Sequence, residues 1–333
     1  MVGHDTEVVP ALSFTEQRWK QISYVHAKSP AESAADGVAR VAAVLGVLLA
    51  WCCSMQETEL RFKFGKNWSA FLSVLTEDRI TIAEESLKKA LKMGSLRGKR
   101  FVDVGCGSGL FSLAAVRLGA TVHSFDYDTD SVATTSELKR RYFPDATHWT
   151  IERGSALDVA YLSGLGRFDI VYSWGVLHHT GNMWQALDNV TALVKQPHGK
   201  LFIAIYNDLG TRTRRWAAIK QFYVSSNPTM QRLLLTMLFA HNQARAVVSR
   251  AMRLENPLPF RWWREYKASR GMSVWHDFVD WVGGYPYETA KPDAIFEFYR
   301  TRGMALEFLT TGGIGCNEYV FSCAAPAQLE IAT

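Results

Sequence analysis

The stretch Arg100-Phe101-Val102-Asp103-Val104-Gly105-Cys106-Gly107-Ser108-Gly109-Leu110-Phe111 decides the fold class of this chain. Its apolar start is typical of a buried strand, three alternating glycines follow as a tight turn, and the next apolar residues have helical spacing. This order holds nucleotide-like ligands in open α/β sheets, because a glycine backbone can approach a ligand closely. The spacing is Gly-x-Gly-x-Gly, and Leu110 stands where a dinucleotide-binding turn needs a third glycine or an alanine. The turn therefore argues against a pyrophosphate-bearing cofactor.

Strand and helix patterns alternate on both sides of this turn. A helix is expected over 76–93 with Thr76 as its N-cap, since apolar residues recur there at helical spacing. Further helices are predicted over 110–118, 131–142, 183–194, 229–254 and 294–302, and further strands over 121–125, 149–152, 168–173, 201–205, 305–309 and 317–323. Such alternation predicts a parallel sheet with right-handed crossovers.

An acidic residue ends the second predicted strand, about 20 residues beyond the glycine turn. Asp126 is placed to accept hydrogen bonds from ribose hydroxyls, and the Tyr127 ring could lie against an adenine. Asp128 or Asp130 fits the other role available there, the N-cap of the next helix.

Together with the segments Gly154–Asp158 and Ser173–His179, these residues resemble the motifs of class I S-adenosylmethionine-dependent methyltransferases. The resemblance covers 76–323 and is nearest to small-molecule methylases of the ubiquinone-biosynthesis type, whose match stops at the core. It implies S-adenosyl-L-methionine as methyl donor, with S-adenosyl-L-homocysteine as product. It also implies a Rossmann-like α/β fold: a seven-stranded, mostly parallel sheet with helices on both faces and an antiparallel last strand. After the fifth strand the regular alternation stops, and we expect a helical cap there. The cofactor residues that it implies are Asp103, Gly105, Gly107, Gly109, Asp126, Tyr127, Ser155, Ala156, Leu157, Asp158, Ser173 and Trp174.

We expect five parts in the chain of 333 residues. They are an N-terminal extension (1–60), the cofactor-binding core (61–208), a basic, aromatic-rich cap (209–293), the last helix and strands of the core (294–323), and a tail (324–333). The extension contains the apolar run Val41–Cys53, which is shorter than the roughly 20 residues of a membrane-spanning helix. We favour a buried or dimer-forming helix there over a membrane-associated one. The five cysteines show no metal-ligand spacing and indicate reduced thiols in a cytoplasmic protein.

The cap carries most of the positive charge. Between Leu209 and Arg270 there are twelve arginine and lysine residues against two glutamates. This pattern is compatible with a solvated basic face, an anionic substrate or peripheral contact with an anionic membrane.

A hydroxyl acceptor needs a general base, and histidine is suited to this near neutral pH. His178 follows the fourth strand and is the first candidate for this base, and His179 and Asp277 are the further candidates. No metal site is expected. The predicted acceptor-binding residues are Tyr206, Asn207, His276, Tyr285, Tyr287 and Glu288.

The sequence thus predicts methyl transfer to oxygen, or second to nitrogen, of a small-molecule, glycan or lipid-linked acceptor. A nucleic-acid or protein methyltransferase is the alternative enzyme. The segment Ser173–His179 argues against nucleic acid, because it lacks the Asn/Asp-Pro-Pro-Tyr type motif that stacks a flipped base. A non-catalytic cofactor-binding protein is the third possibility.

Overall fold

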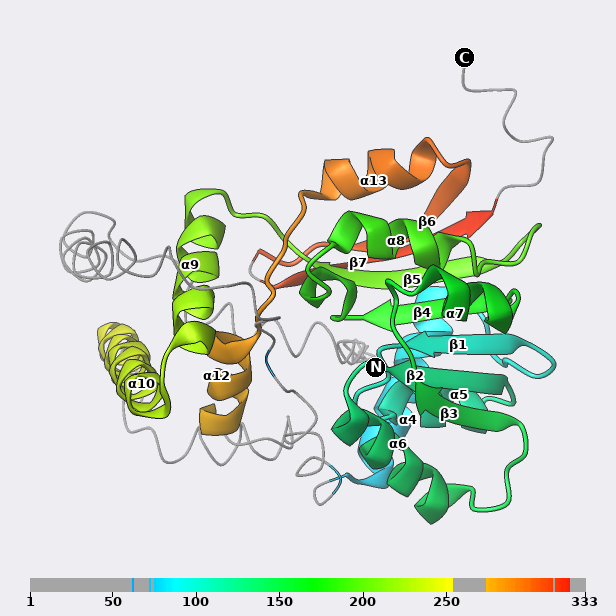
Figure 1. Ribbon diagram of the computed structural model, residues 1–333, viewed down its shortest axis with the longest axis horizontal. Helices are drawn as coiled ribbons and strands as arrows, with labels where there is room; N and C mark the ends of the chain where they lie inside the picture. The colour runs from blue at the N-terminus through cyan, green and yellow to red at the C-terminus, as the bar shows by residue number, and fades with distance from the viewer. Residues whose placement is uncertain (1–61, 63–71, 73–74, 254–273, 314, 324–333) are drawn as a thin grey trace, which may run out of the picture.

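The computed structural model describes residues 62, 72, 75–253, 274–313 and 315–323 (Figure 1). The predicted tail, the run Val41–Cys53 and the rest of the predicted extension lie outside these ranges.

The centre of the fold is a seven-stranded sheet in the order β3-β2-β1-β4-β5-β7-β6. Neighbours from β3 to β5 pair in parallel, whereas β7 is antiparallel to both β5 and β6. The strands are β1 (Arg100–Val104), β2 (Thr121–Asp126), β3 (Trp149–Arg153), β4 (Ile170–Trp174), β5 (Lys200–Tyr206), β6 (Met304–Thr310) and β7 (Cys316–Cys323). The predicted Rossmann-like fold, with its antiparallel last strand, is confirmed.

Helices cover both faces of the sheet, because side chains along each strand point alternately to opposite sides. On β1, Phe101 packs with α4, α5 and α6, and the next residue, Val102, packs with α7, α8 and α13. The covering helices are α4 (Glu77–Leu91), α5 (Leu110–Arg117), α6 (Thr129–Tyr142), α7 (Val159–Leu165), α8 (Met183–Thr191) and α13 (Pro292–Arg300).

Three further helices occupy the stretch assigned to the cap, namely α9 (Thr211–Ser225), α10 (Pro228–Met252) and α12 (Val274–Gly283). Figure 1 shows them together at the left, beyond the carboxyl ends of β4 and β5. They share an apolar cluster of their own, which includes Phe222, Leu234 and Val282. The long predicted helix over 229–254 is α10, whereas α9 was not predicted.

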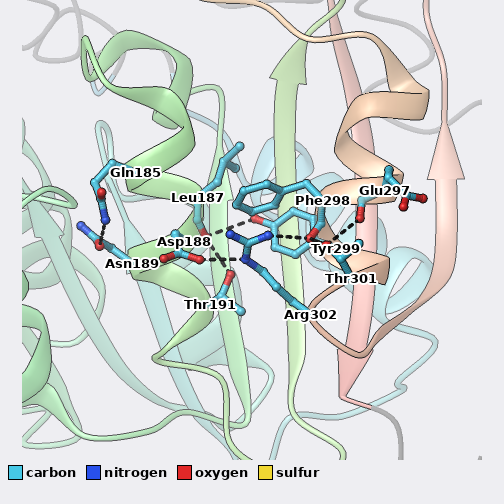
Figure 2. Close-up of polar contacts among 10 residues, drawn as sticks. All are labelled: Gln185, Leu187, Asp188, Asn189, Thr191, Glu297, Phe298, Tyr299, Thr301 and Arg302. Carbon is cyan, nitrogen blue, oxygen red and sulfur yellow. Dashed lines mark hydrogen bonds and ion pairs between the residues drawn. The ribbon is translucent and has the colours of Figure 1, made fainter. Parts of the chain in front are cut away.

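The contact between α8 and α13 fixes the return of the chain from the cap to the sheet (Figure 2). Tyr299 is fully buried, its ring lies 4.5 Å from that of Phe321, and its hydroxyl donates to the Leu187 carbonyl at 3.4 Å. Nearer the surface, Arg302 Nε donates to Asp188 Oδ1 at 2.7 Å. The buried ring therefore stabilises this contact more than the exposed ion pair does.

Replacing Tyr299 by alanine should lower the free energy of unfolding by about 3–5 kcal/mol, because it removes a large buried side chain and leaves a cavity. Arg302→Ala should cost about 1 kcal/mol or less, since its ion pair is partly exposed. Urea denaturation of both variants measures the difference, and similar losses would contradict this account of the contact.

Candidate active site

The glycine turn lies where the carboxyl ends of β1 and β2 meet. Gly105, Gly107 and Gly109 all have positive φ, at 78°, 53° and 77°. The Gly105 and Cys106 amides donate to the Phe125 carbonyl, which joins the turn to β2. A Cβ atom on Gly105 would lie 2.3 Å from a methyl carbon of Val176, so the turn packs closely against the loop after β4. This bare backbone is the kind of cradle that a nucleoside-bearing cofactor requires.

Gly105→Ala should therefore destabilise the protein by about 1–3 kcal/mol more than Gly98→Ala, because only the first overpacks Val176. Gly98 is a matched control, since its φ is 73° and a Cβ atom there would meet no atom within 4 Å. Thermal denaturation of the two variants measures the difference. Equal losses would mean that backbone conformation alone requires the glycine.

Asp103 lies beneath the turn and is only 2% exposed. Its carboxylate accepts a 2.5 Å hydrogen bond from Ser112, whose hydroxyl also contacts that of Ser124 at 2.7 Å. Trp149 Nε1 donates to Ser124 and closes this buried polar chain. Burial raises the pKa of Asp103 to about 7, despite the bond from Ser112. Asp103 thus supports the turn from within the core, and its predicted contact with the cofactor stays a prediction.

The raised pKa predicts a pH dependence of stability. Because Asp103 holds its proton more tightly in the folded chain than in the unfolded chain, its contribution is present below its ordinary pKa of 3.8 and is lost as pH rises to about 7. Melting temperatures at about pH 5 and about pH 8 should therefore differ less for Asp103→Asn than for the unsubstituted protein. An unchanged difference would contradict a protonated Asp103.

Asp126 connects the ends of β1 and β2. Its Oδ2 accepts from the Gly107 amide at 3.0 Å, and its Oδ1 accepts from the Asp128 amide at 2.9 Å. Burial raises its pKa to about 6. The next side chain, Tyr127, is 39% exposed, and the Arg153 guanidinium lies 5.4 Å from its ring centre. A carboxylate and an exposed ring at this edge of the sheet are suited to contact a ribose and a purine. The cofactor contacts of Asp126 and Tyr127 stay predictions.

Two predicted helix caps have different outcomes. Asp128 accepts a hydrogen bond from the Asp130 amide and caps α6, which confirms one of the two predicted alternatives for this N-cap. Asp158, which was predicted to face the adenine, caps α7 through a 3.0 Å bond from the Tyr161 amide. In the same loop, Ser155 Oγ accepts from the Leu157 amide and Ala156 is buried. An adenine contact from this loop stays a prediction.

The end of β4 differs from the prediction. Ser173 is fully buried and donates to the Val104 carbonyl at 2.9 Å, so it links β4 to β1 and has no exposed atom for a cofactor. Trp174 Nε1 donates to Glu318 Oε1 on β7 at 2.6 Å. These residues hold the strand ends together, and the site begins only after them.

A short 3₁₀ turn, η1 (Leu177–His179), places the two histidines differently. His178 is fully buried, and neither ring nitrogen has a hydrogen-bond partner among the described residues. Its pKa lies well below the ordinary value, first because of burial and then because His179 and Lys220 are near, so the ring is neutral. His179 is partly exposed, and its Nδ1 lies 2.6 Å from the Pro286 carbonyl oxygen. Of the two, His179 has the more accessible ring, contrary to the prediction that ranked His178 first.

Tyr206, at the carboxyl end of β5, joins the histidines to the cap. Its ring centre lies 4.1 Å from that of His178 and 5.6 Å from that of His179. On its other side it contacts the rings of Trp281 and Tyr287, at 5.6 and 5.3 Å. The predicted acceptor residues Tyr206 and Tyr287 are therefore brought together beside the histidines.

The buried amino group of Lys220 is a member of this cluster that the sequence analysis missed. It lies 4.3 Å from the Trp281 ring centre and 4.9 Å from that of Tyr287. The sequence shows only one more lysine in a basic segment, although its helical spacing from Trp216 and Tyr223 could have indicated an inward direction.

The segment Tyr285–Glu288 crosses the histidine loop from the cap. Besides the Pro286 carbonyl at His179, the Glu288 amide donates to the His178 carbonyl, and Glu288 Oε2 accepts from the Met183 amide at 2.9 Å. Glu288 thus holds the start of α8, a structural position in place of the predicted acceptor contact. Tyr285 is partly buried in the same segment.

Three predicted acceptor and catalytic residues remain. Asn207 follows β5 and forms a β-bridge with Ala290, and its side-chain amide donates to the Gly313 carbonyl at 3.3 Å. His276 and Asp277 are in α12, but their side chains lie outside the described residues.

Two findings bear on other kinds of site. Within the described ranges, no helix combines the length and apolar character needed to cross a bilayer. The same ranges hold no group of three or more His, Cys, Asp or Glu side chains arranged to bind a metal ion.

Comparison with known proteins agrees with this geometry. Residues 102–201, from β1 into β5, match a family model described as a methyltransferase domain. The chain therefore contains a methyltransferase domain over these residues. The matched range includes the glycine turn, Asp126 and both histidines, whereas the cap lies outside it.

Among similar proteins, a ubiquinone biosynthesis O-methyltransferase of Rhodopseudomonas palustris strain TIE-1 is 28% identical over 144 residues, 43% of this chain and 52% of that protein. A protein of the same name from Brucella ovis is 32% identical over 120 residues, 34% of this chain and 43% of that protein. The chain thus spans about half the length of these relatives. The magnesium protoporphyrin IX methyltransferase of Synechocystis PCC 6803, solved with bound S-adenosylhomocysteine, is 12% identical with a TM-score of 0.45, covering 78% of this chain and 95% of that one.

Proposed function

We propose that this protein transfers the methyl group of S-adenosylmethionine to an oxygen atom of a small-molecule or lipid-linked acceptor, with His179 as general base. The observation that carries the proposal is the position of His179. Its ring follows β4 in the methyltransferase domain, is oriented by the Pro286 carbonyl, and contacts the aromatic ring of Tyr206. The O-methyltransferase relatives support oxygen as the acceptor atom.

The hydrogen bond to Pro286 determines which nitrogen of His179 can act. A carbonyl oxygen only accepts, so Nδ1 carries the proton and Nε2 of the neutral ring carries the basic lone pair. The Pro286 carbonyl thus orients the His179 ring so that its Nε2 can act as a general base. His178 is enclosed on all sides, so in this proposal it supports the rings of His179 and Tyr206.

The bound cofactor supplies an electrophilic methyl group on a positively charged sulfur, which is a good leaving group. The protein therefore has to orient the acceptor and remove its proton. His179 Nε2 would take the proton from the acceptor hydroxyl, while the cofactor, once bound, would supply the methyl group and the sulfur leaving group. Gly107 and Asp126 hold the nucleoside side of the site.

Asp126→Ala should weaken binding of S-adenosylhomocysteine by about tenfold or more, because it removes the carboxylate assigned to the ribose and frees the Gly107 amide. Asp188→Ala is the control. Asp188 lies on α8, away from the glycine turn, and pairs with Arg302. Isothermal titration calorimetry measures both. Unchanged affinity in Asp126→Ala would refute the ribose assignment, and no binding by the unsubstituted protein would refute the proposed function.

His179→Gln should lower the methyl-transfer rate by about 10²-fold or more while leaving S-adenosylhomocysteine affinity unchanged, because only the base is lost. His178→Gln tests the alternative base, and the exposed His198→Gln is a neutral control. The assay follows radiolabelled methyl transfer to a panel of hydroxyl-bearing acceptors. A larger loss in His178→Gln, with a folded protein, would reverse the assignment.

A further inference from the structure

Lys220 is enclosed inside the cap helices rather than extended into solvent. It lies on α9, has no exposed surface, and donates from Nζ to the Trp281 carbonyl on α12. The faces of the Trp281 and Tyr287 rings lie within cation–π distance of its amino group. A lysine normally keeps its amino group in water even when its stem is buried, so this position is unusual.

Lys220 takes part in no ion pair among the described residues. The acidic side chain that influences its amino group is Asp280, one residue before Trp281. The other titratable groups that face it are His178 and Tyr287. Burial outweighs the attraction of Asp280 and lowers the pKa of Lys220 to about 7. An anion beside the amino group would therefore stabilise its charged form.

Lys220 lies close to the residues proposed for methyl transfer. Trp281 and Tyr287, the two rings over its amino group, both contact Tyr206, and Tyr206 contacts the ring of His179. The amino group and the proposed base are thus joined through one layer of aromatic rings. Beside them lies the ring of His178, a second buried polar side chain, which contacts Tyr206 directly.

We propose that Lys220 binds an anionic oxygen group of the acceptor, and that the acceptor is an acid-bearing small molecule with an apolar or aromatic body. This assignment rests on the methyltransferase function proposed above. A buried ammonium is costly without a partner, ring faces offset part of that cost, and an anionic ligand completes the pair. The aromatic rings around it suit the apolar body of the same ligand. Lys220 takes no part in the bond changes, since His179 accepts the proton.

The test compares matched ligands at neutral pH in the presence of saturating S-adenosylhomocysteine. The first pair is 3-(4-hydroxyphenyl)propanoate and its primary amide, which differ in the carboxylate. The second pair is 4-nitrophenol and 4-nitroanisole, which differ in an ionisable oxygen. The unsubstituted protein should bind the anionic member of at least one pair about tenfold or more tightly, as judged by titration calorimetry. Both pairs test whether the protein prefers the anionic oxygen group that Lys220 is proposed to bind.

Two variants separate binding from structural support. Lys220→Met, which keeps the length of the side chain but not its charge, should abolish the preference, whereas Lys220→Arg should retain part of it. S-adenosylhomocysteine affinity should be unchanged in both. Lys220→Met removes a buried charge but also the hydrogen bond to the Trp281 carbonyl, so its melting temperature should change little.

Equal binding within both pairs by the unsubstituted protein, including no binding of any member, would overturn the proposal. So would a preference that persists in Lys220→Met, or a loss of melting temperature in that variant, which would mark a structural role. These outcomes leave S-adenosylhomocysteine binding and methyl transfer intact. Failure of the proposed function would instead abolish those two measurements.

Discussion

The close contact between Gly105 and Val176 is the constraint on which the site depends. Because Gly105 has no side chain, the turn after β1 can lie against the loop after β4. That loop leads directly into the 3₁₀ turn with the two histidines. The same turn is joined to the end of β2 through the Phe125 carbonyl and Asp126. The pairing of β2, β1 and β4 places their ends side by side, and Gly105 lets the turn and the loop at those ends pack closely.

The second determinant of the site is the segment after α12, which lies outside the matched methyltransferase range. Its Pro286 carbonyl orients His179, and its Glu288 side chain holds the first amide of α8. Tyr287, between them, contacts both Tyr206 and Lys220. The core thus supplies the turn and the histidine loop, while the cap orients the histidine and adds the aromatic rings. This division explains how an acceptor preference could differ between proteins that share the core.

Much of the core could be predicted from sequence because its signals are local. The strands alternate or run apolar with clear breaks, so the predicted 121–125 and 317–323 differ from β2 and β7 by one residue each. The antiparallel last strand was predicted from the family resemblance, not from periodicity. Helix α9 was missed because Arg212, Arg214 and Arg215 in its first turn obscure the apolar face formed by later residues.

Within the site, the environments that the sequence did not predict are set by contacts between segments far apart in the chain. Adjacent histidines look equivalent in sequence, and only the packing of 285–288 on their loop exposes one and encloses the other. Asp158 fits either an adenine contact or a helix cap, and the structure shows the cap. Lys220 is buried only because α9 packs on α12, a contact between residues 61 apart that no local pattern records.

The central claim is that the glycine turn, Asp126 and the histidine loop form one cofactor site beneath the cap. A crystal structure of the protein with S-adenosylhomocysteine tests this most directly. We expect the amino-acid end of the ligand along residues 105–109, its ribose hydroxyls at Asp126, and its sulfur directed toward His179. A ligand bound elsewhere, or one whose sulfur faces away from the loop after β4, would contradict the account.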